Sequence, residues 1–344
     1  MIERIDVEAF LEKMKTFLIL DVRSPWEFEQ GHIPGSYNIP LFSDQEREEI
    51  GMLYHHQGRQ AAIIRGLDLC LPKAGRYIPL LQKISSSEDL LLYCWRGGMR
   101  SAMMAEVFSA GGYKAGILTG GYKSFRRHTR ERLSDPARII VLGGHTGSRK
   151  TRLLDELKKA GEQVIDLEEL ACHRGSVFGA FGQAPQPTNE QFENNLYSRW
   201  QELDLTRPVW LEDESRMIGN VTIPDPVIEK ISKGRMVLIE VPHTIRIEHL
   251  VKEYSRFDRK ELAAAIRKLR LRMGGTETAR ALRELEQLRF DAVAEILLSY
   301  YDKAYTFALE RRKDQQIHKI TLKGTDPVAD AKKILRFSRN LPAG

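Results

Sequence analysis

A cysteine and a lysine each stand in a short glycine-bearing loop that follows an apolar run of the sequence. The loop after Cys94 contains Arg96, Gly97, Gly98 and Arg100. Where such a loop leads from a strand into a helix, its backbone N–H groups point inward and stabilise an anion. The same field, strengthened by two arginines, lowers the pKa of the thiol and favours the thiolate. Cys94 is therefore predicted to be a nucleophile or a carrier of sulfur or selenium, assisted by Arg96 and Arg100.

The alternative for Cys94 is a buried, inert thiol, which is the usual fate of a free cysteine at a strand end. The chain has three cysteines, and their scattered positions fit neither a disulfide framework nor a zinc site with paired spacing. Cys70 and Cys172 lack a comparable loop, so we expect both to be structural.

The second loop, residues 144–151, fits the Walker A spacing G-x-x-x-x-G-K-[ST] except at Arg149, which replaces the second glycine. In such a loop the backbone wraps a phosphate, Lys150 neutralises its charge and Thr151 can ligate Mg²⁺. Glycine permits a close backbone approach that a side chain opposes, although arginine can also add a phosphate ligand. A chance glycine-rich turn is the alternative, but a strand precedes the loop and an amphipathic helix follows it. The predicted phosphate-binding residues are Gly144, Gly147, Ser148, Arg149, Lys150 and Thr151.

Carboxylates follow another apolar run, residues 209–211. Glu212, Asp213 and Glu214 are candidates for a Walker B position, where one carboxylate holds Mg²⁺ through water or activates a group at the phosphate. The predicted magnesium ligands are Thr151 and Asp213. An ordinary acidic strand end explains these residues equally well.

The elements that must position these loops alternate between strands and helices, as in a parallel α/β sheet. A charged segment with a proline, residues 126–138, indicates a helix tail and a linker. We therefore expect two α/β domains, residues 1–128 and 136–344, with long helix-forming stretches from Asp258 onward as a helical annex on the second. The predicted strands lie at 17–23, 89–94, 115–121, 138–144, 208–213 and 235–242, and the predicted helices include 101–110 and 150–161.

Composition narrows the class of protein. The chain of 344 residues is 42% apolar and 29% charged, which is typical of globular proteins. Neither a run of about 20 apolar residues nor a signal-peptide pattern is visible, so we expect a cytoplasmic protein with no membrane partner. The net charge of +6 favours polyanionic or phosphorylated partners.

The segment LDVRSPWEFEQGHIPGSYNIP, residues 20–40, resembles the strand and turn that mark the rhodanese family. The resemblance covers roughly the first 125 residues and includes LTGGYKSF after the last predicted strand. It implies that Cys94 carries a persulfide or perselenide. His32, in the turn, is expected to be a structural hydrogen-bonding residue.

A rhodanese-like domain followed by this phosphate loop resembles one family over almost the whole chain, the tRNA 2-selenouridine synthases. Further marks of the family are YCWRGGMRS, LYHHQGRQAAIIRGL, HRGSVFGAFGQAPQPTNEQFENNL, LEDESRMIG and LLSYYDKAY. The resemblance implies an N-terminal rhodanese-like parallel sheet and a C-terminal P-loop NTPase-like parallel sheet with its annex. It also implies a transferase that converts wobble 2-thiouridine of tRNA to 2-selenouridine, by way of an S-geranyl intermediate. Selenophosphate and geranyl diphosphate are then co-substrates, Mg²⁺ is a candidate ion, no permanently bound cofactor is expected, and an enzyme that supplies selenophosphate is a candidate partner.

This chemistry suggests a division of labour between the loops. The diphosphate would bind at the lysine loop, and Cys94 would support selenium exchange while Arg96 and Arg100 steady selenophosphate. The interpretation requires that the sulfur of Cys94 is not sealed in the core and that the ammonium of Lys150 faces a cavity. The stretch 175–182 is a candidate slot for the geranyl chain or a hydrophobic turn packed on the core, and His173, Arg174 and Ser176 are further candidates for phosphate contact.

Arg267 and Arg270 lie one helical turn apart and are candidates for tRNA contact, although a solvated helix face is the commoner reason for such charges. Two rival functions stay open. One is a rhodanese-type sulfurtransferase fused to an ATP-binding P-loop kinase or ATPase that acts on a small molecule. The other is a tRNA-binding scaffold whose sites have decayed, for which Arg149 is the best evidence.

Overall fold

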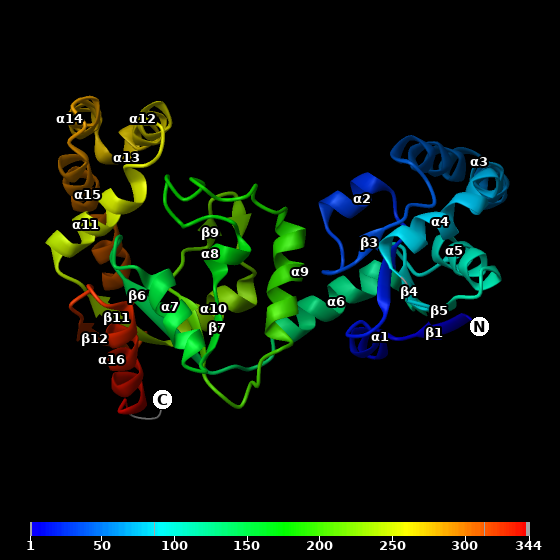
Figure 1. Ribbon diagram of the computed structural model, residues 1–344, viewed down its shortest axis with the longest axis horizontal. Helices are drawn as coiled ribbons and strands as arrows, with labels where there is room; N and C mark the ends of the chain where they lie inside the picture. The colour runs from blue at the N-terminus through cyan, green and yellow to red at the C-terminus, as the bar shows by residue number, and fades with distance from the viewer. Residues whose placement is uncertain (1, 86, 313, 342–344) are drawn as a thin grey trace. The chain divides into compact units, whose positions relative to one another are not determined.

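A computed structural model describes residues 2–85, 87–312 and 314–341, and it divides into two compact units. Unit 1 comprises residues 1–133 with 193–198, and unit 2 comprises residues 134–192 with 199–344. Each unit contains a five-stranded sheet in which every pairing is parallel. The prediction of two α/β units with parallel sheets is confirmed (Figure 1).

The sheet of unit 1 has the order β1-β5-β4-β2-β3. Its strands are β1 (Ile2–Ile5), β2 (Leu18–Asp21), β3 (Tyr37–Asn38), β4 (Asp89–Tyr93) and β5 (Lys114–Leu118). Both faces of the sheet are buried, because Leu90 and Leu92 of β4 pack into one apolar cluster and Leu91 and Tyr93 pack into the other. A continuous apolar run such as that of β4 is what a parallel strand covered on both faces requires.

Within the described residues, seven helical segments lie wholly in unit 1, which also includes residues 193–198 of α9 (Asn189–Trp200). They are α1 (Val7–Lys13), α2 (Pro25–Gln30), α3 (Asp44–Cys70), the short 3₁₀ helix η1 (Leu71–Lys73), α4 (Ala74–Ile84), α5 (Met99–Ala110) and α6 (Gly121–Leu133). α2 and α3 each begin with a capping box, at Ser24 and Ser43 respectively, in which the serine hydroxyl and a glutamate satisfy N–H groups of the first turn.

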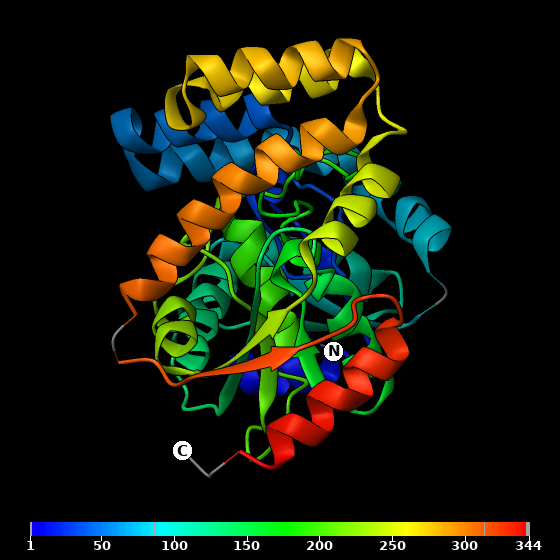
Figure 2. The ribbon, with the colours of Figure 1, turned by 90° about the vertical axis from the view of Figure 1, so that its left-hand side faces the viewer.

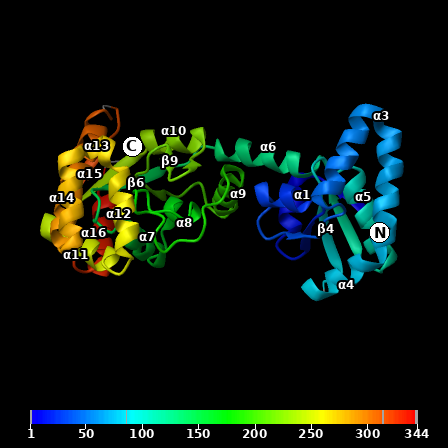
Figure 3. The same cartoon turned by 90° about the horizontal axis from the view of Figure 1, so that it is seen from above.

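Helix α3 is a hairpin of two helical arms, which meet at Gly58. Gly58 has φ 85°, a conformation that glycine adopts without steric cost. An ion pair of 2.6 Å between Arg65 Nε and Glu49 Oε1 joins the two arms, and a Cβ on Gly66 would lie 3.9 Å from Ile50. Figure 3 shows the arms lying antiparallel.

The sheet of unit 2 has the order β12-β11-β6-β8-β7. Its strands are β6 (Ile139–Gly144), β7 (Gln163–Ile165), β8 (Val209–Glu212), β11 (Arg235–Glu240) and β12 (Ile317–Thr321). A separate antiparallel ribbon consists of β9 (Met217–Ile218) and β10 (Val221–Thr222). In Figure 2, β11 and β12 run side by side with α16 below them.

The helices of unit 2 include a group at one end that forms the expected annex. Four of them, α12 (Arg259–Lys268), α14 (Gly275–Glu286), α15 (Phe290–Glu310) and the short α13 (Arg270–Met273), enclose an apolar cluster of their own. The others are α7 (Lys150–Lys159), α8 (Leu167–Leu170), α9 (Asn189–Trp200), α10 (Asp225–Lys233), α11 (His243–Tyr254) and α16 (Pro327–Arg339). Within the described residues, no helix combines the length and the apolar character needed to cross a membrane.

Candidate functional site

The thiol of Cys94 lies directly after β4, at the start of a loop that leads into α5. Its sulfur is 3.4 Å from the hydroxyl of Ser101, whose oxygen also lies 3.1 Å from Gly98 O. Burial by itself would raise the pKa of Cys94. The positive charge of Arg100 and hydrogen bonds from Ser101 and from the backbone N–H of Arg96 outweigh burial, so the pKa lies below its ordinary value. The anion-stabilising field expected from the sequence is therefore present.

The two arginines of this loop have different surroundings. Arg100 donates to both carboxylate oxygens of Glu27, at 2.6 and 3.3 Å, and Glu27 also lies 3.8 Å from Arg47. Arg96 is exposed, and none of the described carboxylates pairs with it. Arg100 therefore belongs to an ion-pair chain that fixes the loop, whereas the side chain of Arg96 is available to an incoming anion.

The sulfur is more deeply placed than a reactive thiol in an open loop. Cys94 is only 3% exposed, and it packs with the apolar cluster on one face of the sheet. Its neighbours Trp95 and Met99 are 38% and 55% exposed. The condition that the sulfur is not sealed in the core is therefore not met in this conformation of the loop, and a reactant can reach the thiol only if the loop moves.

Two glycines set the shape of the thiol loop. Gly97 and Gly121 both have positive φ, 62° and 60°. A Cβ on Gly97 would lie 2.1 Å from Leu118 O, and a Cβ on Gly121 would lie 2.3 Å from both Cys94 O and Gly97 N. The loop therefore rests backbone to backbone on the turn after β5, which explains why glycines occur in both segments.

Residues of the 20–40 segment stabilise this arrangement from within. Arg23 and Asp21 form an ion pair of 2.6 Å in which both side chains are buried, and Arg23 also donates to Gly31 O at 2.6 Å. The guanidinium carbon of Arg23 lies 4.0 Å from the centre of the Tyr122 ring. His32 stacks on Phe28 with ring centroids 3.8 Å apart, and its Nδ1 is 3.0 Å from Phe28 O. These contacts are structural, in line with the role expected for His32.

The lysine loop connects β6 to α7 in unit 2. The ammonium of Lys150 lies over its own loop, 3.0 Å from Gly144 O. Ser148 is buried, and its hydroxyl donates to His145 O. Gly147 has φ 83°, and a Cβ there would be 3.0 Å from Arg246 O. The loop thus has the compact, glycine-dependent turn that a phosphate cradle requires.

Helices α11 and α15 hold the lysine loop from outside. Arg246 of α11 donates to Thr146 O at 3.1 Å and to Asp302 of α15 at 2.8 Å. His249 Nδ1 lies 2.9 Å from Gly147 O. The backbone N–H of Gly144 donates to the hydroxyl of Tyr305 at 2.9 Å. Because these backbone groups are held by hydrogen bonds with α11 and α15, the geometry of the loop depends on helices that are distant in the sequence.

Arg149 adopts the left-handed backbone conformation, with φ 58° and ψ 41°. An L-residue with a side chain pays roughly 1–2 kcal/mol to adopt this conformation. Burial and the nearby charge of Arg152 lower the pKa of its guanidinium. The backbone at position 149 therefore has the left-handed conformation that suits a glycine, and Arg149 adopts it at a cost in free energy.

The carboxylates near the lysine loop are arranged differently from the sequence expectation. Asp213 accepts from Arg312 at 2.6 Å and from the hydroxyl of Tyr305 at 2.7 Å, so its oxygens are engaged in the fold. Glu212 is buried and accepts from Leu167 N at 2.9 Å. Burial, together with the charge of Asp166, raises the pKa of Glu212 well above its ordinary value.

Two glutamates lie next to Lys150 and Thr151: Glu168, which was not predicted, and Glu214, which was one of the three predicted Walker B candidates. Glu168, at the start of α8, accepts from the hydroxyl of Thr151 at 3.0 Å. Glu214 adjoins Glu168, and a Cβ on Gly175 would lie 3.1 Å from one and 3.2 Å from the other. Burial and the charge of Glu168 raise the pKa of Glu214 to about 8, against the opposing charge of Lys150. Glu168 follows β7, so the rule that parallel strands end at one edge was the only signal that could have found it.

His173 and Arg174 lie in structural contacts, whereas Ser176 faces a cavity. His173 is buried between Gly179 and Gly219, whose Cβ positions would approach its ring within 2.6 and 2.8 Å. Arg174 forms an ion pair with Glu253 of α11. Ser176 lines an apolar cavity together with Phe178, so part of the 175–182 stretch does face a hydrophobic space.

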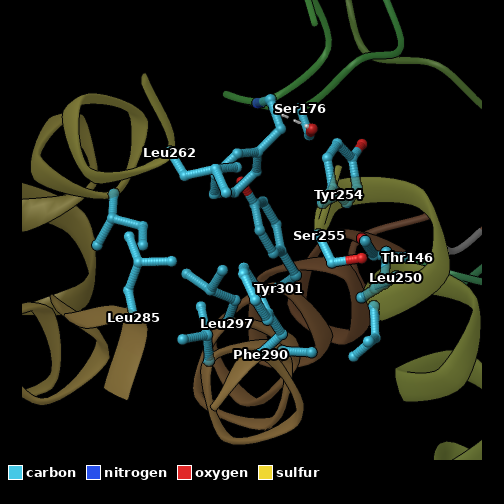
Figure 4. A pocket seen from close by; sticks show the side chains of 15 residues that line it. Thr146, Ser176, Leu250, Tyr254, Ser255, Leu262, Leu285, Phe290, Leu297 and Tyr301 are labelled. Atoms are coloured by element: carbon cyan, nitrogen blue, oxygen red, sulfur yellow. Dashed lines mark hydrogen bonds between the residues drawn. The ribbon is translucent and has the colours of Figure 1, made fainter. Parts of the chain in front are cut away.

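This cavity lies among the annex helices and reaches the lysine loop (Figure 4). It contains about 580 Å³ of empty space, part of it open to solvent. Its wall includes Thr146 of the loop, and the polar groups on it are few. The remaining lining residues are Leu250, Val251, Tyr254, Ser255, Leu262, Ile266, Leu285, Phe290, Val293, Ala294, Leu297 and Tyr301.

Arg267 and Arg270, the residues expected to contact tRNA, are exposed at the junction of α12 and α13. Lys268 and Arg272 are exposed beside them, and no described carboxylate pairs with any of the four. Leu271, in the middle of this group, is 98% exposed. The surface is therefore basic and uncompensated, and it lies on the annex.

The fold and the two loops define a class of protein in which a rhodanese-like domain is joined to a P-loop domain. Residues 6–128 match the model of the rhodanese-like domain, and residues 137–331 match that of the tRNA 2-selenouridine synthase AAA domain. Proteins named tRNA 2-selenouridine synthase from Nitrosomonas europaea and Hydrogenovibrio crunogenus are 30% and 33% identical to this chain. The first alignment covers 86% of this chain and 90% of the relative, and the second covers 87% and 91%. The chain belongs to the tRNA 2-selenouridine synthase family.

The close backbone contact of the thiol loop predicts a sharp difference between two glycines. Gly121→Ala should displace the loop, because its Cβ would overlap Cys94 O and Gly97 N. We expect a loss of about 2–4 kcal/mol in the free energy of unfolding and slower alkylation of Cys94. Gly98→Ala is the matched control, since its Cβ would meet nothing within 4 Å. Equal effects of the two substitutions on chemical denaturation would contradict this account.

The charge environment of Cys94 predicts the pH dependence of its reactivity. The thiolate is the reactive form, so a lowered pKa shifts the rise in alkylation rate to a lower pH than for an ordinary cysteine. Arg100→Met should move the midpoint upward, whereas Arg96→Met should leave it in place, because only the backbone of Arg96 contacts the sulfur. Iodoacetamide rates measured across pH, with those of Cys94→Ala subtracted, provide the test. An equal shift in both variants would show that the assignment to Arg100 is incorrect.

Proposed function

We propose that this chain converts 2-thiouridine at the wobble position of tRNA to 2-selenouridine, and that the reaction proceeds through an S-geranyl intermediate. The relatives named above supply the tRNA substrate and the selenouridine product by their names. The observation that carries the proposal is the apolar cavity that begins at Thr146, inside the phosphate loop. A ligand that fits both features has an anionic diphosphate head and a hydrocarbon tail.

The cavity suits the tail of geranyl diphosphate. Leu262, Leu297 and Phe290 present hydrocarbon and aromatic surface to it. Burial of each CH₂ group contributes roughly 0.8 kcal/mol, so a ten-carbon chain gains several kcal/mol of binding free energy there. A kinase or ATPase that acts on a small polar molecule would have no use for such a surface.

Geranylation is the first step. The sulfur of 2-thiouridine attacks C1 of the geranyl group, the C1–O bond breaks, and diphosphate leaves with the electron pair. The pyrimidine loses its N3 proton as the sulfur becomes a thioether. Lys150, Arg149 and the inward N–H groups of the loop stabilise the charge that develops on the leaving diphosphate. The side chain of Lys150 needs only to turn from Gly144 O towards the phosphate.

Magnesium would be held at this site by Thr151 and Glu168. Their oxygens lie 3.0 Å apart, and Mg²⁺ commonly takes one or two protein ligands together with substrate phosphates and water. Asp213, the carboxylate that the sequence suggested as a magnesium ligand, is already engaged with Arg312 and Tyr305. Glu168 would therefore act as the carboxylate ligand in its place. The described part of the chain holds no group of three or more metal-ligating side chains. Bound magnesium would add positive charge beside the diphosphate.

Selenium exchange is the second step. The selenium atom of selenophosphate attacks C2 of the geranylated base, the C2–S bond breaks, and the geranyl thiolate leaves with the electron pair. Water then attacks phosphorus, the P–Se bond breaks and inorganic phosphate leaves, so that selenium stays on C2 and N3 regains a proton. Alkylation matters because it turns a poor sulfur leaving group into a better one. We assign selenium delivery to Cys94 and its loop, where Arg96 can bind the phosphate oxygens of selenophosphate and the charge of Arg100 lowers the pKa of the thiol. Arg267 and Arg270 provide basic surface for tRNA on the annex.

The division between the two loops is tested by one pair of variants. Cys94→Ala should abolish selenation and spare geranylation, whereas Lys150→Ala should lower the geranylation rate at least about 100-fold. The protein is incubated with 2-thiouridine tRNA, geranyl diphosphate and selenophosphate, each is omitted in turn, and the nucleosides are analysed by mass spectrometry. If Cys94→Ala abolished both steps in a folded protein, or if selenation survived, the division would be refuted. ATP hydrolysis that does not depend on tRNA would favour the kinase or ATPase alternative.

The role of the cavity is tested by filling it. Ala294→Phe places a benzyl group among the lining residues, so geranylation should fall about tenfold or more while the affinity for inorganic pyrophosphate is retained. Ala264→Phe is the matched control, because Ala264 is exposed on the neighbouring helix α12. Equal geranylation rates in both variants would show that the prenyl chain binds elsewhere.

A further inference from the structure

The distal end of the α3 hairpin is an exposed surface for which the reactions above provide no role. We propose that the tip of this hairpin, residues 52–60, binds the tRNA substrate through its phosphates and unpaired bases. The inference rests on the proposed function, because it assigns a contact surface for the same substrate.

The tip projects from unit 1 without packing on its core. Only Ala62, Gly66 and Cys70 of the whole hairpin are buried, and all three belong to the returning arm. Residues 54–60 are exposed without exception, and Met52 and Tyr54 are each 53% exposed. Because so few residues of the hairpin are buried, the side chains at its tip contribute little to the stability of the fold. They are therefore accessible to a partner.

Charge along the hairpin is separated by position. All its acidic residues lie near the base, and no aspartate or glutamate occurs from Ile50 to Leu67. Several acids at the base are engaged locally: Glu46 with Lys73, Glu49 with Arg65, and Asp44 with the backbone of Trp26. The tip therefore carries no negatively charged side chain that would repel a polyanion.

The side chains at the tip are those that recognise single-stranded RNA. Arg59 is exposed, and no described carboxylate pairs with it, so its guanidinium can bind phosphate. Tyr54 and His55 present rings with centroids 6.1 Å apart and perpendicular planes, which offers stacking surfaces to unpaired bases. His56, Gln57 and Gln60 add hydrogen-bonding groups.

The base of the hairpin adjoins the thiol loop within the same unit. Glu27 lies between Arg100 of that loop and Arg47 in the first turn of α3. From there the first arm rises about 16 Å to the turn at Gly58, at 1.5 Å per residue. That distance corresponds to roughly five nucleotide steps of a stacked strand. A uridine at Cys94 would thus place neighbouring nucleotides of its stem or loop within reach of the tip.

The test measures tRNA binding by the full-length chain. Tyr54→Ala/Arg59→Ala should weaken binding of 2-thiouridine tRNA about tenfold in fluorescence anisotropy, since one stacking contact and one phosphate contact are lost. Arg59→Ala alone should reduce the slope of log affinity against log salt by about one. Lys332→Ala/Arg336→Ala on α16 is the matched control, because it removes exposed basic residues elsewhere. Cys94 alkylation should be the same in all variants, which shows that unit 1 is folded.

A crosslink supplies a second, independent measurement. A photoreactive phenylalanine analogue at Gln57 should attach to bound tRNA on irradiation, whereas the same group at Lys332 should not. Unchanged tRNA affinity of the tip variants and no crosslink at Gln57 would overturn the inference, even if the nucleoside assay still shows selenouridine. Loss of modification at unchanged tRNA affinity would also overturn it, since the tip would then contact another macromolecule such as a protein. If the unaltered chain neither bound nor modified tRNA, the proposed function itself would fail.

Discussion

Contact between backbone atoms that only glycine permits is the constraint on which both loops of this protein depend. At the thiol loop, Gly97 and Gly121 bring two turns within a distance that no side chain could occupy. At the lysine loop, Gly147 does the same against the carbonyl of Arg246. Each loop follows a strand of a parallel sheet, so its N–H groups gather where the strands end, and the glycines keep that space free of side chains. The chemistry proposed for each loop, a thiolate in one and phosphate binding in the other, depends on this geometry.

Helices α11 and α15 contact both the lysine loop and the apolar cavity. Arg246 and His249 of α11 hold carbonyls of the loop, while Leu250 and Tyr254 on the same helix line the cavity. Helix α15 likewise supplies Tyr305 to the loop, Asp302 to Arg246 and Tyr301 to the cavity. A head group and a tail bound at these two places would therefore be kept in fixed register by two rigid elements, which limits the loss of entropy on reaching the reactive geometry.

Local sequence patterns were enough to predict the two loops, but they did not predict the long-range contacts around them. The runs before Cys94 and before Gly144 are strands, and the helices after both loops start within two residues of the predicted positions. Asp213 shows where this reasoning ended, because a carboxylate after a strand looks the same in sequence whether it meets a metal or, as here, Arg312. The approach of Glu168 to Thr151 depends on the order of strands in the sheet, which one sequence does not specify. The short edge strands β1 and β3, and the hairpin form of α3, also lacked a distinct periodic signal.

The depth of Cys94 has a consequence for the durability of the protein. Oxidation of a cysteine to sulfinic and sulfonic acids depends both on its thiolate character and on its contact with solvent. In this loop the two factors oppose each other, because the charge of Arg100 favours the thiolate while the surrounding core leaves the residue 3% exposed. A sulfur so placed is biased towards the thiolate and is nevertheless shielded from oxidants in solvent, which limits its oxidation.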